Sequence, residues 1–139
     1  DTQIISRLIE GQYPDYQQII PKNFTTQAVV NRNELINNVK VASLFSGKVN
    51  NIKLLIQPKK SLIEISAKDI DTGENKSQIE GKIEGKEVEI IFNYRYLLDG
   101  LNNILSDKVV LSLNTSANPV VIKPVGDASY TYLVMPIRA

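Results

Sequence analysis

Residues 88–105 read V-E-I-I-F-N-Y-R-Y-L-L-D-G-L-N-N-I-L, and the hydrophobic period changes within them. The segment Val88–Phe92 has the apolar and β-branched character of a strand. Asn93 is a favoured residue for a helix N-cap, and apolar residues then recur at the spacing of an amphipathic helix. The stretch therefore predicts a strand followed directly by a helix from Tyr94 to about Leu105. Its core-facing residues are predicted to be Leu97, Leu98, Leu101, Ile104 and Leu105.

Gly100 lies inside this predicted helix and costs stability there. A glycine in a helix interior is less favourable than alanine by about 1 kcal/mol. Close packing against another element and simple sequence drift explain such a glycine equally well, so both explanations stay open.

A second transition from strand to helix lies earlier in the chain. Thr25–Val30 is rich in β-forming residues, and either Asn31 or Asn33 then offers an N-cap. The helix is expected to continue to about Phe45, with Gly47 as its stop. Its apolar stripe consists of Leu35, Ile36, Val39, Ala42 and Phe45.

The other regular segments are predicted to be strands separated by turns. Pro58–Ser61 is a turn-prone segment that indicates a hairpin, and residues 71–74 together with Gly85-Lys86 indicate a meander. These strands are predicted near residues 52–57, 62–67, 77–83, 109–113, 119–122 and 129–137.

The order strand, helix, four strands, helix, three strands indicates an α+β fold. Two amphipathic helices side by side on one face of an antiparallel sheet would bury both apolar stripes. Ahead of this domain, residues 2–9 are predicted as a strand without an evident partner, and Gly11–Pro21 as a connecting loop. We expect that strand to be mobile or to pair between molecules.

Composition excludes several classes of function. The chain has 139 residues with 42% hydrophobic content, enough for one modest core. It contains no Cys and no His, which removes thiol nucleophiles, disulfides, imidazole bases and nearly every zinc or copper site. Any catalysis would therefore have to rest on carboxylates, hydroxyls or lysines, and we expect no cofactor and no metal site. Sixteen basic and fifteen acidic residues give a net charge of +1, which argues neither for nor against nucleic acid.

The sequence also carries a signal about location. It shows no secretory h-region and no apolar run approaching about 18 residues. The absence of Cys fits a reducing compartment. We therefore expect a cytoplasmic protein.

Three ordered motifs carry a resemblance to a known family. They are R-L-I-E-G-Q-Y-P-D-Y-Q-Q-I-I-P at 7–21, F-N-Y-R-Y-L-L-D-G-L at 92–101 and Y-L-V-M-P-I-R at 132–138, ahead of the terminal Ala139. Together they resemble the bacterial DNA sliding clamp, the beta subunit of DNA polymerase III. The resemblance covers nearly the whole chain, as the third, C-terminal domain of that family preceded by the closing strand of its second domain.

The resemblance implies a division of the chain and a function without catalysis. Residues 1–10 would be the closing strand of the preceding domain, 11–23 an interdomain linker and 24–139 the clamp domain. In the family, two three-domain protomers form a ring around duplex DNA, with helices lining the hole and sheets outside. The ring tethers the replicative polymerase and acts as a processivity factor, and it also receives the clamp loader and repair proteins.

A hydrophobic groove on the outer surface of that ring captures short linear peptides. Apolar and thioether side chains would form its floor, while amide, hydroxyl and guanidinium groups would orient the ligand. Without the motif, a strand pattern at the C-terminus more often means core packing, and Asn93 and Tyr96 more often mean an N-cap and a packing residue. The matching residues are Pro14, Ile19, Asn93, Tyr96, Leu133, Met135, Pro136, Ile137 and Arg138.

Two further surfaces follow from the same resemblance. Phosphate contact would use basic residues on and near the helices, although any single one is more often a solvated charge. Those residues are Arg32, Lys40, Lys48 and Arg95. Ring closure would use Leu44 and Phe45 at the end of the first helix, which ordinary helix-end core packing explains equally well. Gln17, Gln18 and Ala139 depart from the family pattern, which reduces the expected phosphate attraction and groove depth.

Two alternatives come from other classes of function. One is a peptide-binding or scaffold module unrelated to replication, which composition permits. The other is a carboxylate-based hydrolase around Asp71, since D-T-G at 71–73 also occurs in aspartic proteases. That chemistry requires an apolar strand before the aspartate, but Lys68-Asp69 precede this one, so a hairpin loop is favoured.

Overall fold

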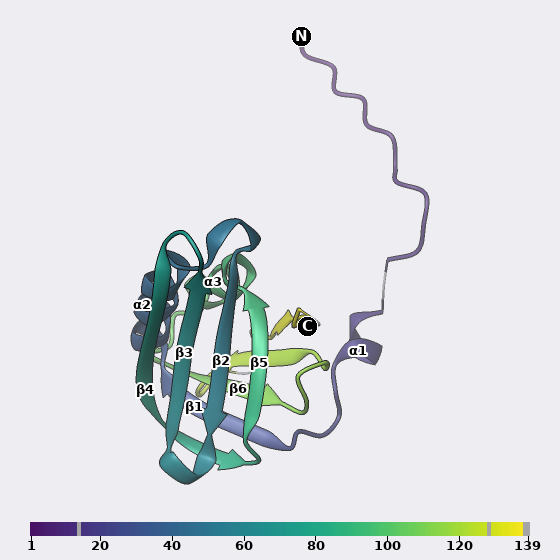
Figure 1. Ribbon diagram of the computed structural model, residues 1–139. Coiled ribbons are helices and arrows are strands. Elements are labelled where there is room, and N and C mark those ends of the chain that lie inside the picture. The colour runs from purple at the N-terminus through teal and green to yellow at the C-terminus, as the bar shows by residue number, and fades with distance from the viewer. Residues whose placement is uncertain (14, 128, 138–139) are drawn as a thin grey trace.

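The computed structural model describes residues 1–13, 15–127 and 129–137 (Figure 1). Within them, antiparallel pairing joins the strands into one curled sheet in the order β5-β2-β3-β4-β1-β6-β7-β8. The helical elements are α1 (Tyr16–Ile19), α2 (Arg32–Ser43), α3 (Tyr94–Asn102) and the 3₁₀ turns η1 (Gly47–Val49) and η2 (Pro58–Lys60). The strands are β1 (Thr26–Asn31), β2 (Asn51–Gln57), β3 (Leu62–Asp69), β4 (Gly73–Gly85), β5 (Val88–Asn93), β6 (Lys108–Leu113), β7 (Val120–Pro124) and β8 (Tyr132–Val134).

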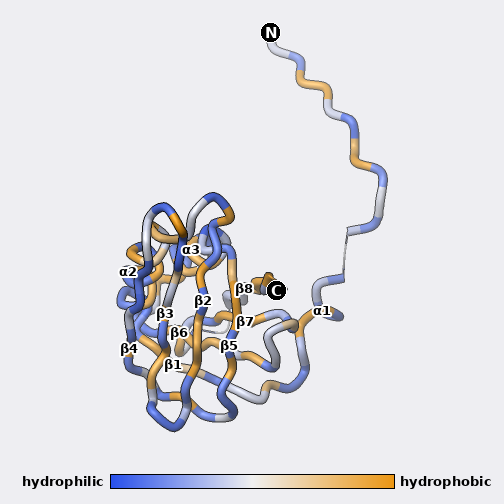
Figure 2. Tube along the Cα trace, viewed as in Figure 1, coloured by the Kyte–Doolittle hydropathy of each residue, from blue (hydrophilic) through white to orange (hydrophobic). Residues whose placement is uncertain are grey.

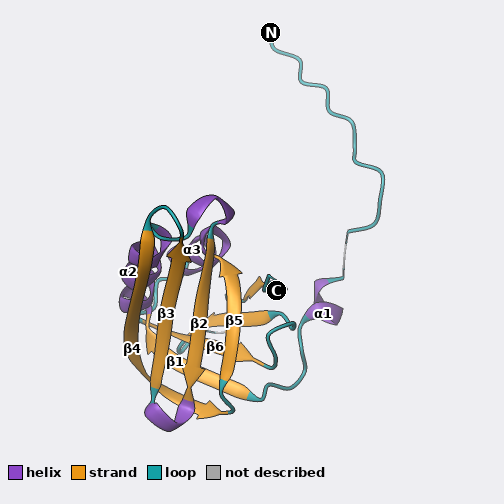
Figure 3. Cartoon of the chain, viewed as in Figure 1, coloured by secondary structure: helices purple, strands orange, loops and turns teal. Residues whose placement is uncertain are grey.

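Both long helices begin where the sequence predicted. The side-chain oxygen of Asn31 accepts a hydrogen bond from the backbone N–H of Glu34 at 3.0 Å, and that of Asn93 accepts one from Arg95 at 3.0 Å. Each N-cap satisfies a backbone donor that has no partner within its helix. The helices contact each other and lie on one face of the sheet (Figure 3), so the predicted α+β layers are confirmed.

The second helix is shorter than predicted. Its last turn tightens, because the backbone N–H groups of Asn103 and Ile104 bond to the carbonyls of Gly100 and Leu101 three residues earlier. Ile104 is buried by this turn, whereas Leu105 is 96% exposed. The prediction that Leu105 faces the core was therefore wrong, since the helical period ends before it.

The predicted meander is also wrong at one point, because β5 does not pair with β4. The first part of β4, residues 73–80, pairs with β3, and residues 81–85 pair with β1. The end of β4 nearest β5 is therefore paired with β1, and β5 pairs with the free edge of β2 instead. Gly81 lies at the switch, where a Cβ atom would come within 2.7 Å of the carbonyl oxygen of Val29.

The domain consists of two similar halves, β1-α2-β2-β3-β4 and β5-α3-β6-β7-β8. The first strand of each half pairs with the second strand of the other, β1 with β6 and β5 with β2. β4 ends beside β1, and the chain after β8 returns to β5, where the Ile137 N–H donates to the Ile91 carbonyl at 2.8 Å. The sheet thus has two junctions. The first lies between β4 and β1, and the second lies between β5 and the C-terminal segment.

The segment ahead of the domain extends away from it (Figures 1 and 2). Residues 1–9 form no strand, and the apolar side chains Ile4, Ile5, Leu8 and Ile9 are 87–96% exposed. The predicted strand at 2–9 is absent because an isolated strand needs a partner for its backbone groups. Within the predicted loop at 11–21, Asp15 instead caps the short helix α1. In the described part of the chain no helix has the length and apolar character to cross a membrane.

Candidate functional site

A pocket of about 380 Å³ lies between the start of α3 and the C-terminal segment. The pocket joins residues about forty positions apart in the chain, because β8 lies against α3 and the residues after β8 return to β5. The lining residues are Asn93, Tyr96, Tyr132, Leu133, Val134, Met135 and Ile137. Five of these were predicted from the motifs, and Tyr132 and Val134 were not.

The floor of this pocket is formed by the end of the chain. β8 is only three residues long and pairs with β7, with Val134 opposite Val120 and buried. The predicted strand at 129–137 begins only at Tyr132, and it ends early because Pro136 has no N–H to donate to a ladder. Met135 is therefore released from regular pairing and remains 54% exposed. A flexible thioether at an open apolar surface suits ligands of varied shape.

The polar edge of the pocket comes from the first turn of α3. Asn93 uses its side-chain oxygen as the N-cap, which leaves the amide NH₂ as a donor. Tyr96 is 60% exposed, so its ring presents both an apolar face and a hydroxyl. Few polar groups around an apolar floor are typical of a site that orients a ligand by a small number of hydrogen bonds.

The other predicted groove residues lie outside this lining. Ile19 is exposed in α1, and Pro136 is half-buried just after β8, but neither lines the pocket. Pro14 and Arg138 lie outside the described residues. The pocket therefore contains the β8 and α3 part of the predicted groove.

The four predicted phosphate-facing residues separate into two groups. Lys40, Lys48 and Arg95 are exposed, and the Arg95 guanidinium lies 5.9 Å from the ring centroid of Tyr94. Hydrogen bonding and charge interaction with Tyr94 raise the pKa of Arg95, which is cationic in any case. Arg32 is half-buried, and its guanidinium donates to the carbonyls of Leu101 and Ile104 at the end of α3.

The two predicted ring-closure residues also differ. Leu44 is 71% exposed, whereas Phe45 packs against the core. Ile70 in the turn between β3 and β4 is exposed as well. Residues 73–79 of β4 pair with β3 but have no strand along their other edge in the part of the chain described. An exposed apolar residue and a free strand edge thus lie on one side of the domain.

The D-T-G segment has the geometry of a turn. One oxygen of Asp69 accepts hydrogen bonds from the backbone N–H groups of Asp71 and Thr72 and from the Thr72 hydroxyl, at 3.0–3.2 Å. Asp71 itself is exposed. The carboxylate that organises this segment is engaged in holding the turn, and no second carboxylate is placed to share a proton with Asp71 among the interactions of the described residues.

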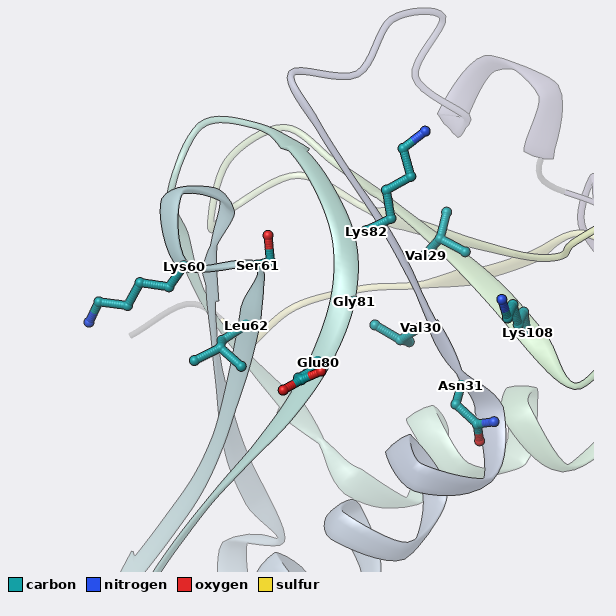
Figure 4. Close-up of a pocket in the computed structure, with 10 residues that line it drawn as sticks. All are labelled: Val29, Val30, Asn31, Lys60, Ser61, Leu62, Glu80, Gly81, Lys82 and Lys108. Carbon is teal, nitrogen blue, oxygen red and sulfur yellow. The ribbon is translucent and has the colours of Figure 1, made fainter.

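A larger hollow of about 700 Å³ lies where β4 passes from β3 to β1 (Figure 4). Its lining includes Lys60, Lys82, Lys108 and Glu80 around Val29, Val30 and Leu62. The three lysine side chains point in different directions and do not converge on a common point (Figure 4). This hollow therefore lacks the convergent polar groups that a ligand site requires.

Comparison with known proteins gives one consistent result. The family model described as "DNA polymerase III beta subunit, C-terminal domain" matches residues 17–138. A curated relative from Synechococcus elongatus, named "Beta sliding clamp", is 34% identical over 139 residues, covering 99% of this chain and 37% of the relative. One of the same name from Staphylococcus aureus is 31% identical over 135 residues, covering 96% of this chain and 36% of the relative.

Solved structures agree with the sequence relatives. The DNA polymerase sliding clamp of Bacillus subtilis has a TM-score of 0.88 and 32% identity over 96% of this chain and 36% of that chain. The DNA polymerase III beta subunit of Thermotoga maritima has a TM-score of 0.89 and 30% identity over 96% of this chain and 36% of that chain. A sliding clamp from Pseudomonas aeruginosa bound to griselimycin has a TM-score of 0.88 and 27% identity, with the same coverage. The chain therefore spans little more than a third of its relatives' length.

Proposed function

Because the chain belongs to the family of C-terminal domains of the DNA polymerase III beta subunit, we propose that it is one domain of a bacterial replication clamp. Two three-domain protomers would close a ring around duplex DNA and tether the replicative polymerase. The domain then acts by topology and peptide capture and has no reaction of its own. The support is the family match over 17–138 together with the pocket between α3 and β8.

The N-terminal residues fit this arrangement as part of the preceding domain. Residues 1–10 would complete the sheet of that domain, 11–23 would link the two domains, and 24–139 would form the clamp domain. The exposed apolar side chains Ile4, Ile5, Leu8 and Ile9 support this division, because such a segment gains most by adding to a sheet elsewhere.

The pocket between α3 and β8 would receive the apolar residues of a short linear peptide. Its apolar floor of Leu133, Met135 and Ile137 would bury leucine or phenylalanine side chains, and Asn93 and Tyr96 would bind the peptide backbone. Pro14, Ile19, Pro136 and Arg138 would complete the groove. Polymerase, clamp loader and repair proteins would share this site through similar motifs.

A fluorescence-polarisation titration with a labelled pentapeptide, Gln-Leu-Ser-Leu-Phe, tests this proposal. Saturable binding to the chain is expected, and Met135→Ala or Tyr96→Ala should weaken it by about tenfold, since each removes apolar area worth on the order of 1–2 kcal/mol. Leu105→Ala is the matched control, because Leu105 is an exposed apolar residue that does not line the pocket. Its effect should stay within about twofold.

A longer chain that carries the preceding domain separates two kinds of failure. Binding only to the longer chain would mean that the wall supplied by that domain is essential. Failure of both chains to bind the peptide, or equal loss from Met135→Ala and Leu105→Ala, would reject the pocket as a peptide site.

Contact with DNA would be weak and independent of sequence. Lys40, Lys48 and Arg95 are exposed on or beside the helices and would face the phosphates. Asn37, Asn38, Asn102 and Asn103 lie on the same helices or at their ends, and amides meet phosphates through water without holding them tightly. This combination suits a surface that must slide.

Ring closure would use the side of the domain with Leu44 and the free edge of β4. A strand of the other protomer's first domain would pair with residues 73–79, and Leu44 and Ile70 would be covered by its side chains. Phe45 would support the contact from beneath, because it is packed against the core. The homodimer follows from two such contacts related by symmetry.

A further inference from the structure

Tyr132 connects the two walls of the peptide pocket. It lies in β8 opposite Ile122 of β7, and its side chain reaches across to α3. Its hydroxyl donates to the backbone carbonyl of Tyr96 at 2.8 Å. One wall of the pocket is thus bonded directly to the other, at the residue whose ring forms the pocket's aromatic edge.

The Tyr132 ring packs directly against the backbone of Gly100. A Cβ atom at Gly100 would overlap ring atoms of Tyr132, so only glycine allows the ring to lie this close to the helix. Tyr96 and Gly100 are four residues apart and therefore lie on the same face of α3. The ring spans one helical turn, from the bare backbone at Gly100 to the carbonyl of Tyr96.

Among the described residues, few other hydrogen bonds hold the C-terminal segment in register with α3. β8 contributes three residues to the ladder with β7, and Ile137 adds one hydrogen bond to β5. A second tyrosine, Tyr130, donates its hydroxyl to the Gly100 carbonyl at 3.1 Å. That bond lies at the last turn of α3, and Tyr130 does not line the pocket.

We propose that Tyr132 is a positioning residue, which sets the width of the pocket by fixing the first turn of α3 against the C-terminal segment. The inference rests on the proposed peptide site and adds to it a residue that acts through Tyr96. Without the hydroxyl, the first turn of α3 and Met135 are no longer held at one separation, and the free protein samples wider and narrower pockets. A ligand then selects the competent width and binds with reduced apparent affinity.

Tyr132→Phe and Tyr130→Phe form a matched pair for the test. Each removes one hydroxyl that donates to a carbonyl of α3, so both should lower the denaturation midpoint by similar amounts. Only Tyr132→Phe should weaken binding of the labelled pentapeptide Gln-Leu-Ser-Leu-Phe, by about fivefold, while Tyr130→Phe stays within about twofold. Equal loss of affinity in the two variants would overturn the proposal.

Amide chemical shifts of the free protein give a readout that does not depend on peptide binding. In Tyr132→Phe, the resonances of Tyr96, Leu97 and Met135 should move or broaden, and in Tyr130→Phe those near Asn103 should change instead. If Tyr132→Phe weakens binding but leaves the free-state resonances of Tyr96 and Leu97 in place, Tyr132 contacts the ligand directly and the positioning role is wrong.

Gly100→Ala tests the packing of the Tyr132 ring against α3 without removing the Tyr132 hydroxyl. It should displace the Tyr132 ring and change the same resonances of Tyr96 and Met135. If the wild-type chain binds no peptide but these shifts still occur, the peptide site fails and the positioning role stands. If the shifts of Tyr96 and Met135 are unchanged in both Tyr132→Phe and Gly100→Ala, the positioning role is rejected.

Discussion

Replacing Arg32 should destabilise the domain, although the sequence suggested a residue that faces DNA. Arg32 is the first residue of α2, and its guanidinium donates to the carbonyls of Leu101 and Ile104 and to the side chain of Asn33. The Leu101 carbonyl also accepts a hydrogen bond from the Ile104 N–H, and the Ile104 carbonyl lies just past the last residue of α3, so both are near the negative end of the helix dipole. One cation therefore holds the start of one helix to the end of the other.

The cost of Arg32→Met can be estimated from these contacts. Hydrogen bonds from a charged donor contribute about 1.5–3 kcal/mol each, and a cation at a helix C-terminus contributes about 0.3–1 kcal/mol. The 3.4 Å bond to Leu101 is long, and the buried Nε of Arg32 has no partner among the described residues, which lowers the net benefit of the arginine. We expect a loss of roughly 2–3 kcal/mol of unfolding free energy.

Urea denaturation at neutral pH measures this loss, with Lys48→Met as the matched control. Lys48 is exposed in η1, so its replacement should change stability by less than about 0.5 kcal/mol. The loss of unfolding free energy for Arg32→Lys should fall between the losses for Arg32→Met and Lys48→Met, because lysine keeps the positive charge but lacks the planar guanidinium with its several donors. An unchanged midpoint for Arg32→Met would refute the reasoning and return Arg32 to the DNA-facing residues.

Two further predictions follow from burial and charge. Urea denaturation should show that Phe45→Ala lowers the free energy of unfolding by roughly 2–4 kcal/mol and Leu44→Ala by less than about 0.5 kcal/mol. The difference is expected because only Phe45 packs against the core, and equal losses would contradict this. Burial alone would raise the pKa of Glu64, but hydrogen bonds from Lys76 and Gln78 lower it below its ordinary value. Glu64 therefore stabilises the fold above its unfolded pKa, and the benefit is lost as pH falls through the folded pKa. Glu64→Gln should lower the free energy of unfolding by roughly 1 kcal/mol at pH 7, and this loss should shrink as the pH falls below the ordinary carboxyl pKa. A loss that does not change with pH would contradict the prediction.

Local patterns in the sequence predicted most of the elements correctly. Asn31 and Asn93 mark both helix starts, because an N-cap depends on one side chain and the backbone two or three residues away. The apolar stripes of both helices were predicted from period alone, except at Leu105. The motifs at 92–101 and 132–138 together predicted five of the seven residues that line the pocket, and these two motifs with the one at 7–21 carried the family assignment.

Strand pairing and side-chain contacts depend on partners that are distant in the chain, and the sequence alone did not identify those partners. Packing against Tyr132 accounts for Gly100, and drift no longer has to be invoked. The path of β5 to β2 depends on which edges remain free once β4 has paired with β3 and β1.

The sequence by itself determined most of the elements and their order, because these follow from residue types within a few positions of each other. Its three motifs together also carried the family and five of the residues that line the pocket. Only the tertiary structure decided that Arg32 binds the end of α3, that Leu44 is exposed while Phe45 packs against the core, and that Tyr132 joins two walls. Such roles are contacts between residues up to some seventy positions apart, and a side chain of one chemical type can face solvent or a distant backbone. Only the folded structure decides which of these two environments a given side chain has.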